Sequence, residues 1–514
     1  MYTWIVVTGG LFAFIAAMGI GANDVANAYA TSVGSKALTI KQAVLCATVF
    51  ETSGAILMGS HVTNTIRKGI ADYECFEDDP GALMYGCMWV CFCVGVWLFI
   101  ACKYEMPVST THSSVGGMIG MTIALKGTQC VIWYEPREMF PYIGGVSGII
   151  ISWILSPVFS GIISSTLFGV MRKFILRSSQ SFNRTTYLFP VLIGTTITLN
   201  TFFIIYKGAK GLGLDETPMS QATIISFGVG GVSAIIIYPF TRYIRDTVVK
   251  RIKQEEKSID LHKSELGVLI EEAYTPNCCD IVSHINTNLK VNINDIILND
   301  NTVNDIHDNA EKFDEATEEY FKSLQIFTAM CDSFSHGAND VANAIGPLAA
   351  IVSTFSQETV AAKVGIPIWV LVIGAVGLAL GLLLFGPKLI HTVGDKITRL
   401  NAPRAYCVAL ASAVTVLIAT TLGLPVSSTH IAIGAIFGVG FLREVLENPN
   451  KRRLKPGHKL NQTSADAFSN VNVRLKRKLV RRNFVFSIAA AWVITVPASA
   501  FIAGALFFVL SALV

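Results

Sequence analysis

Charged residues are scarce in this sequence. Asp, Glu, Lys and Arg make up 15% of its 514 residues, whereas an average soluble domain has about 25%. The formal net charge is only +4, and the basic residues are scattered beside apolar segments, which argues against a nucleic-acid-binding protein. No Walker-type phosphate-binding loop is present, so the sequence gives no support for transport or chemistry driven directly by ATP.

Metal-binding cysteine pairs are missing as well. The eleven cysteines include no C-x-x-C pair with the spacing of a metal site. Most of them lie inside apolar runs, where cysteine behaves as a small hydrophobic residue. We therefore expect a protein without a cofactor.

Long apolar runs dominate what is present, because hydrophobic residues make up 52% of the chain and 42 residues are glycine. A run of about 20 apolar residues is long enough to cross a bilayer as a helix. The sequence therefore predicts an all-α polytopic membrane protein with about twelve transmembrane segments. These are at residues 4–30, 39–59, 83–102, 108–125, 142–171, 186–206, 221–240, 324–352, 366–386, 405–424, 426–441 and 484–514.

Two motifs occur twice. Gly-Ala-Asn-Asp-Val-Ala-Asn-Ala stands at 21–28 and again at 337–344, each time inside an apolar run. Pro-Val-Ser-Thr-Thr-His at 107–112 is repeated as Pro-Val-Ser-Ser-Thr-His at 425–430. Seven of the predicted segments precede the second copy of the octapeptide, so it enters the membrane in the opposite direction. The pattern predicts two inverted repeats with broken or re-entrant helices, the arrangement with which secondary transporters build a site at the membrane midplane.

The repeats divide the chain into four parts. The polar part between the repeats has acidic and Asn-rich tracts and little apolar periodicity, so we expect it to be a largely disordered cytoplasmic loop. The expected parts are a first transmembrane repeat unit at 1–171, an additional helix pair at 186–240, this loop at 241–322, and a second, inverted repeat unit at 323–514.

Basic residues beside the predicted segments indicate the orientation, because cytoplasmic loops are enriched in Lys and Arg. If each Pro-Val-Ser segment is counted as a complete crossing and both termini lie outside, most of the basic residues fall on the inner side. We therefore expect a multi-pass protein of the plasma membrane with both termini outside. Cys75 and Cys130 then both lie outside. We hypothesise a disulfide between them, with Cys87 close enough to compete.

The octapeptides carry acids and amides where hydrocarbon-soluble side chains are expected. We expect the glycine and asparagine to interrupt the helix, which frees backbone carbonyls that a small cation satisfies together with side-chain oxygens. A purely structural role in interhelical hydrogen bonding is the alternative, but buried carboxylates are costly and here form a symmetry-matched pair. The candidate cation ligands are Asn23, Asp24, Asn27, Asn339, Asp340 and Asn343.

Each Pro-Val-Ser motif is typical of a helix N-terminus, where free backbone N–H groups and hydroxyl donors suit a tetrahedral oxyanion. The candidate anion ligands are Ser109, Thr110, Thr111, Ser427, Ser428 and Thr429. His112 and His430 follow them and are expected to support these ligands, hydrogen-bond the anion or relay protons. Two carboxylates alone would repel an oxyanion, so cations must lie between them, and cotransport follows from charge balance.

Two other classes are less favoured. An intramembrane hydrolase built on Ser109, His112 and Asp24 has no supported catalytic triad, and inversion gives no reason for a catalytic site to occur twice. A passive anion channel would be lined by rings of charge. We therefore expect a transporter that is not an enzyme.

The paired motifs resemble those of the inorganic phosphate transporter (PiT) family of sodium-dependent phosphate symporters, and the resemblance covers both halves of the chain. It implies import of inorganic phosphate with sodium as the coupling ion, by alternating access of an elevator-like or rocking kind. It also implies that Glu51 and His336 take part in coupling, while a homodimer is a further expectation. A glutamate that relatives often carry is replaced here by Ala409, so proton-coupled transport of phosphate or transport of sulfate stays an alternative.

Overall fold

The structure is a computed structural model. Its described residues form thirteen α-helices and one small β-hairpin. These residues are 2–138, 142–206, 217–265, 311–357, 360, 366–422, 424–447 and 480–511.

Five α-helices form the part of the chain before residue 172. They are α1 Thr3–Gly34, α2 Ile40–Lys68, α3 Pro80–Lys103, α4 Thr110–Lys126 and α5 Gly145–Met171. Four short elements accompany them: the 3-10 turns η1 Tyr73–Phe76 and η2 Thr128–Cys130, and the strands β1 Glu135–Pro136 and β2 Ile143–Gly144. One π-helical turn, η3 Arg172–Leu176, extends α5.

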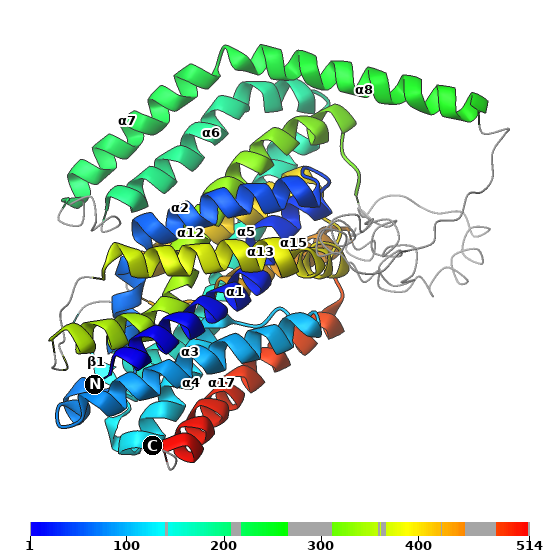
Figure 1. Cartoon of the computed structure of the whole chain (residues 1–514). Coiled ribbons are helices and arrows are strands. Elements are labelled where there is room, and N and C mark those ends of the chain that lie inside the picture. The colour runs from blue at the N-terminus through cyan, green and yellow to red at the C-terminus, as the bar shows by residue number, and fades with distance from the viewer. Residues whose placement is uncertain are drawn as a thin grey trace, which may run out of the picture.

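Eight further helices follow. α6 Ser181–Ile205 and α7 Met219–Ile237 pack side by side, and α8 Phe240–Glu265 continues from α7 and extends away from the bundle (Figure 1). The remaining helices are α12 Glu315–Gln357, α13 Ile368–Lys396, α14 Ala402–Thr421, α15 Ser428–Glu447 and α17 Arg482–Ser511.

Ten of the described helices are long and apolar enough to cross a membrane, which confirms the prediction of an all-α polytopic membrane protein. Two predicted segments are not among these ten: 324–352, which lies within α12, and 108–125. The latter forms α4, which has 17 residues and is about 25 Å long at 1.5 Å per residue, shorter than a hydrocarbon core of roughly 30 Å. α4 begins at the buried Thr110 and α15 at the buried Ser428, so both helices start inside the protein.

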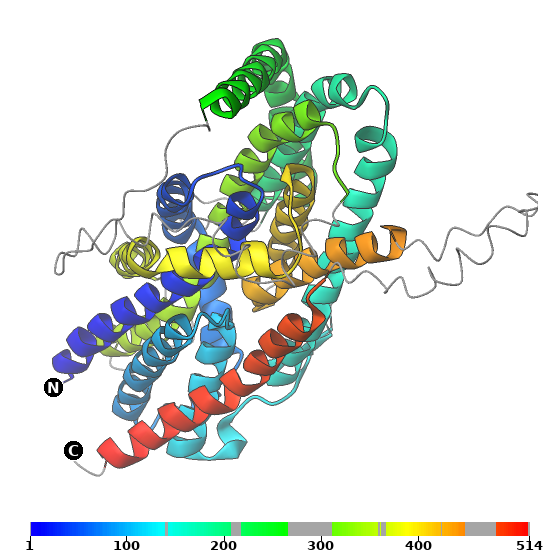
Figure 2. The same ribbon diagram turned by 90° about the vertical axis from the view of Figure 1, so that its right-hand side faces the viewer.

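The two halves of the chain are interleaved. α1 packs against α13 and α12 packs against α2, so each octapeptide helix rests on a helix from the other half. In the same way α4 packs against α17 and α15 against α5. α1 begins and α17 ends at one end of the molecule, which we call the terminal face (Figures 1 and 2).

The glycine that opens each octapeptide allows this interleaving. A Cβ atom at Gly21 would lie 2.0 Å from the backbone oxygen of Leu378 in α13, and one at Gly337 would lie 2.0 Å from that of Glu51 in α2. Both α1 and α12 run through their octapeptides as continuous helices. The expected helix interruption is therefore wrong, because the glycines serve close helix packing and leave the backbone hydrogen bonds in place.

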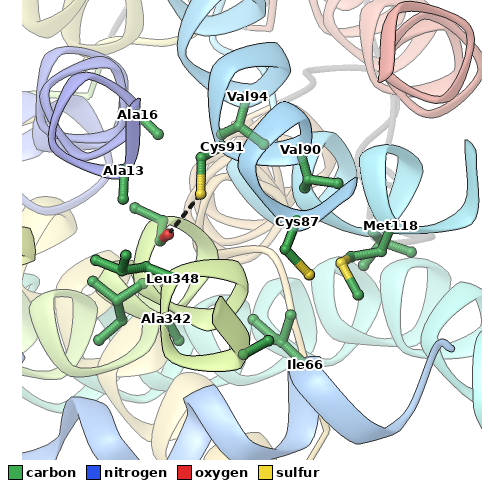
Figure 3. Packing of buried hydrophobic residues seen from close by; sticks show 14 of the residues in the cluster. Ala13, Ala16, Ile66, Cys87, Val90, Cys91, Val94, Met118, Ala342 and Leu348 are labelled. Carbon is green, nitrogen blue, oxygen red and sulfur yellow. Dashed lines mark hydrogen bonds between the residues drawn. The ribbon is translucent and has the colours of Figure 1, made fainter. Parts of the chain in front are cut away.

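The largest apolar cluster lies between α1, α3, α4, α12 and α13. Figure 3 shows its centre, where α3 places Cys87, Val90 and Cys91 against Leu348 of α12 and Met118 of α4. The Cys91 thiol donates a weak hydrogen bond of 3.8 Å to the backbone oxygen of Ala344. Because Ala344 ends the second octapeptide, this packing holds α12 firmly where it carries the polar residues.

A disulfide joins Cys75 in η1 to Cys130 in η2, as hypothesised. The backbone pairs beside it, since Asp72 N–H donates to Cys130 O and Ile132 N–H donates to Ile70 O. The connection between α2 and α3 is thus attached to the connection between α4 and α5.

The prediction of a largely disordered loop at 241–322 is wrong for residues 241–265, which belong to α8, and for residues 315–322, which belong to α12. Ile244, Val248 and Ile252 recur every four residues and place one apolar face of α8 against the bundle, with Val248 buried. The many charges around these three residues hid this periodicity. Residues 266–310 lie outside the described part of the chain.

Candidate functional site

Asn23 and Asp24 lie on one turn of α1 and face the start of α4. The Asp24 carboxylate accepts a hydrogen bond of 2.9 Å from the Thr110 hydroxyl, and the Asn23 amide donates one of 2.7 Å to Val108 O. Asn23 and Asn27 also donate to the same Asp24 oxygen, at 3.1 and 3.3 Å. Each of these polar side chains is at most 2% exposed, so the carboxylate is held by protein donors in a dry environment.

The second octapeptide repeats this arrangement against α15. The Asp340 carboxylate accepts hydrogen bonds of 2.8 Å from both the Ser428 hydroxyl and the Asn339 amide. Asn339 also donates to Val426 O at 3.3 Å. Each octapeptide therefore binds the hydroxyl-rich helix start of its own half through equivalent residues.

The last asparagine of each octapeptide contacts the opposite half. Asn27 donates to the hydroxyls of Ser428 and Thr429, at 3.1 and 3.0 Å. Asn343 donates to those of Thr110 and Thr111, at 3.1 and 3.4 Å. All twelve predicted acid, amide and hydroxyl ligands are buried, and these bonds bring the starts of α4 and α15 to one place between α1 and α12.

Two further hydroxyl contacts cross between the halves. Thr111 donates to Val426 O at 3.0 Å, and Thr429 donates to Val108 O at 3.2 Å. Ser109 and Ser427 act differently, because their hydroxyls accept hydrogen bonds from the N–H groups of His112 and His430 and cap the two helices. The helix N-termini predicted from the Pro-Val-Ser motifs are thus present.

Four amide oxygens at this site have no hydrogen-bond partner although they are buried. They are the side-chain oxygens of Asn23, Asn27, Asn339 and Asn343. Buried amide oxygens nearly always accept a hydrogen bond, so these four symmetry-related oxygens are candidate ligands for an electropositive group. Neutral oxygens beside carboxylates are suitable ligands for a hard cation. In α1 the spare oxygens thus come from side chains and not, as the sequence suggested, from an unwound backbone.

The two histidines form a ring stack behind the helix starts. His112 and His430 lie edge to face with ring centroids 4.5 Å apart, between Trp153 of α5 at 3.6 Å and Trp492 of α17 at 3.7 Å. Each histidine Nδ1 lies 3.1 Å from the backbone oxygen of the tryptophan stacked on the other histidine. The histidines therefore connect α4 and α15 to the helices that pack beside them. These two tryptophans were not predicted from the sequence.

Glu51 and His336 are buried near the second octapeptide but make none of the described hydrogen bonds to the hydroxyl-rich helix starts. His336 lies one turn before Asp340 on α12, where its Nε2 is 3.2 Å from Asp332 and 3.3 Å from the Ser412 hydroxyl. Asp332 is 1% exposed and was missed in the sequence. Its spacing of four residues from His336 and eight from Asp340, inside an apolar run, is the signal that identifies it.

The geometry gathers the candidate ligands for a cation and for an anion in one buried place between α1 and α12. A family model described as the phosphate transporter family matches residues 20–503. A putative phosphate permease of Haemophilus influenzae is 32% identical over 99% of this chain and 97% of its own. The chloroplastic inorganic phosphate transporter 2-1 of Arabidopsis thaliana is 34% identical over 84% of this chain and 65% of its own.

A solved structure agrees with these sequences. It is described as the sodium-dependent phosphate transporter and superposes with a TM-score of 0.70. It is 30% identical in sequence and covers 99% of this chain and 100% of its own. The range matched by the family model, residues 20–503, spans both octapeptides.

Proposed function

This chain belongs to the phosphate transporter family, and from that premise we propose that it imports inorganic phosphate together with sodium ions by alternating access. The observation that carries the proposal is the set of four buried amide oxygens without donors, two beside Asp24 and two beside Asp340. They stand directly next to the hydroxyls at the starts of α4 and α15. Phosphate and sodium thus have separate, adjacent ligands.

Sodium binds between the acids and the phosphate in this proposal. Asn23, Asp24 and Asn27 supply ligands for one ion, and Asn339, Asp340 and Asn343 supply ligands for a second. Oxygen-only ligands suit a hard cation that has lost its water. The positive charge of the ions removes the repulsion between two carboxylates and a phosphate anion, so neither ligand binds well alone, and this mutual dependence couples their transport.

Phosphate binds to the hydroxyls and N-termini of α4 and α15. Thr110, Thr111, Ser428 and Thr429 turn toward the site, while Ser109 and Ser427 cap the helices and orient their N–H groups. His112 and His430 position these helices through the tryptophan stack. Hydroxyl groups and backbone N–H groups at the positive end of a helix dipole favour an oxyanion, which would take over the hydroxyl protons that protein oxygens accept here.

Alternating access follows from the interleaved halves. The segment before α15 lies beside the β1–β2 hairpin, and the segment before α4 follows the end of α3 that lies away from η1. An elevator-like or rocking movement opens one route while the other stays closed. We further propose that the terminal face lies outside the cell at the plasma membrane and that the protein assembles as a homodimer.

The test is uptake of radiolabelled phosphate by the purified protein in liposomes, measured in sodium, lithium and choline media from mildly acidic to mildly alkaline pH. Uptake that requires sodium and proceeds against a phosphate gradient supports the proposal. Competition by excess sulfate would indicate a wider anion specificity. Equal uptake in all three media, with no accumulation, would show that the protein is not a sodium symporter.

Coupling to protons is the second candidate, because a buried His–Asp pair lies one turn from the cation site. His336 and Asp332 are each 1% exposed, and the Nδ1 atom of His336 and one oxygen of the nearby Glu51 have no hydrogen-bond partner. A pair of this kind can exchange a proton with the transport pathway. Uptake in choline medium that is driven by an imposed proton gradient would favour this mechanism.

A further inference from the structure

A small pocket opens on the terminal face beside the chain segment that precedes α15. Its walls are Gly69 after α2, Arg137 of the β1–β2 hairpin, the glycine-rich start of α5, and Leu424 and Pro425. The disulfide between Cys75 and Cys130 attaches the connection that begins at Gly69 to the connection that carries Arg137. The pocket is therefore lined by separate parts of the chain, two of which are covalently linked.

The pocket and the central site share one wall. Pro425 lines the pocket, and the next residue, Val426, has its backbone oxygen in the site, where Thr111 and Asn339 donate to it. The Ser152 hydroxyl of α5 donates to Pro425 O at 3.2 Å and fixes this segment to the start of the pocket's other wall. An ion in the pocket is thus one short segment of chain away from the hydroxyls of α15.

Arg137 is the charged side chain that lines the pocket. It pairs with Glu135 of the same hairpin, with 3.3 Å between the guanidinium and the carboxylate. The side chains of Arg137 and Glu135 are 34% and 50% exposed, so water screens their charges and the ion pair is weak. A competing anion of suitable shape can therefore replace the carboxylate.

Gly144 leaves space for the Arg137–Glu135 ion pair because it has no side chain. A Cβ atom there would lie 2.5 Å from a Glu135 carboxylate oxygen and 2.6 Å from Arg137 Nε. Gly145 follows with a φ of +68°, a backbone conformation that favours glycine. The absence of a side chain at the start of α5 thereby leaves room for the Arg137 guanidinium and the Glu135 carboxylate beside the pocket.

We propose that this pocket is a capture site in which Arg137 binds inorganic phosphate before it reaches the hydroxyls of α4 and α15. A guanidinium binds two oxygens of a tetrahedral oxyanion at once, and it binds a chloride ion at a single point. Phosphate takes the place of Glu135 on Arg137, and Glu135 in turn prevents strong retention of the anion. This inference rests on the proposed function and adds an entry step to it.

The two members of the pair predict opposite effects. Arg137→Gln removes the captured anion's partner, so the KM for phosphate uptake should rise by roughly 3- to 10-fold with the maximal rate within about twofold of wild type. Glu135→Gln removes the competitor and should lower the KM by about 2- to 5-fold. Arg137→Lys keeps the charge without the two-point contact and should give an intermediate KM.

The measurement is the initial rate of phosphate uptake against phosphate concentration at saturating sodium, in liposomes where phosphate is supplied to the terminal face. Glu138→Gln is the matched control, because Glu138 is an exposed acid of the same hairpin that does not line the pocket. Its KM should equal that of wild type. Raising the ionic strength with choline chloride should increase the KM of wild type more than that of Arg137→Gln.

An unchanged KM in both Arg137 variants would overturn the inference while leaving sodium-dependent transport intact. Equal changes of KM in Glu135→Gln and Glu138→Gln would also overturn the inference, because they would show that only the overall surface charge matters. Absence of sodium-dependent phosphate uptake by the wild type would instead refute the proposed function and this entry step with it. Size-exclusion profiles that match wild type confirm that each variant is folded.

Discussion

Replacing either octapeptide acid by its amide tests the central proposal most directly. Asp24→Asn and Asp340→Asn keep the size of the side chain and one oxygen, so the helix packing around them should survive. Each substitution removes one negative charge from a site that is 2% exposed. If the acids bind sodium, only ion affinity and the transport coupled to it should decrease.

The structure predicts which of the two substitutions weakens sodium binding more. Losing a charged ligand weakens binding of the cation by roughly 1 to 3 kcal/mol, which corresponds to about 5- to 150-fold. Asp24 accepts hydrogen bonds from four side chains, including Thr110 at 2.9 Å and Thr429 at 3.4 Å. Asp340 accepts them from Asn339 and Ser428. An amide nitrogen at position 24 therefore meets more donors, and Asp24→Asn should have the larger effect.

The assay is the sodium dependence of phosphate uptake at several phosphate concentrations. Both variants should need more sodium for half-maximal uptake, and their apparent phosphate affinity should recover partly as sodium is raised, because coupling between the ions is reciprocal. Asp246→Asn is the control, since it removes an exposed acid from α8. Unchanged sodium dependence in both octapeptide variants would show that the carboxylates only hold helices together, and the proposed mechanism would be wrong.

Three further predictions address the anion site, the stability of the fold and its packing. Ser109→Ala combined with Ser427→Ala removes both helix caps, so phosphate affinity should fall while added sodium restores uptake poorly, as concentration series of both ions would show. Glu311 precedes α12 and accepts hydrogen bonds of 2.7 Å from two arginines; burial raises its pKa, but the arginines outweigh burial and hold it below the usual 4.5. Because the pKa of folded Glu311 is lowered, the stability that its carboxylate contributes is present above pH 4.5 and is lost as pH falls through the folded pKa. Glu311→Gln should therefore lower the free energy of unfolding at pH 7 by about 1 to 3 kcal/mol, seen as a lower melting temperature. The difference in melting temperature from wild type should disappear below pH 4.5. Gly337→Ala places a methyl group 2.0 Å from a backbone oxygen of α2, so the yield of folded protein on size exclusion should drop sharply, whereas Gly228→Ala in α7, with open space around it, should match wild type.

Much of the site was predictable because it is repeated within the sequence. Identical octapeptides at 21–28 and 337–344, together with two Pro-Val-Ser motifs, identified all twelve candidate ligands that the structure gathers between α1 and α12. Local chemistry was also sufficient for the helix starts at Thr110 and Ser428, because proline followed by hydroxyl residues favours a helix N-terminus. Glu51 and His336 were placed by resemblance, and their part in coupling stays a prediction.

Other features depend on neighbours that lie far away in the chain. The role of Gly21 is decided by Leu378 in α13, which approaches within contact distance only after the halves interleave. In the same way, the tryptophan stack exists because Trp153 of α5 and Trp492 of α17 lie against the histidines of α4 and α15. Such pairings are set by packing between halves, which no local pattern encodes.

The sequence by itself determined the composition class, the repeated units and the chemical types of the ligands, because each depends on residues that are neighbours in the chain or identical between its halves. Tertiary structure alone decided that the octapeptides stay helical, and it left the amide oxygens without donors. It also joined the Arg137 pocket to Pro425. These features arise where helices from opposite halves meet, and the free energy of that packing depends on the whole three-dimensional arrangement.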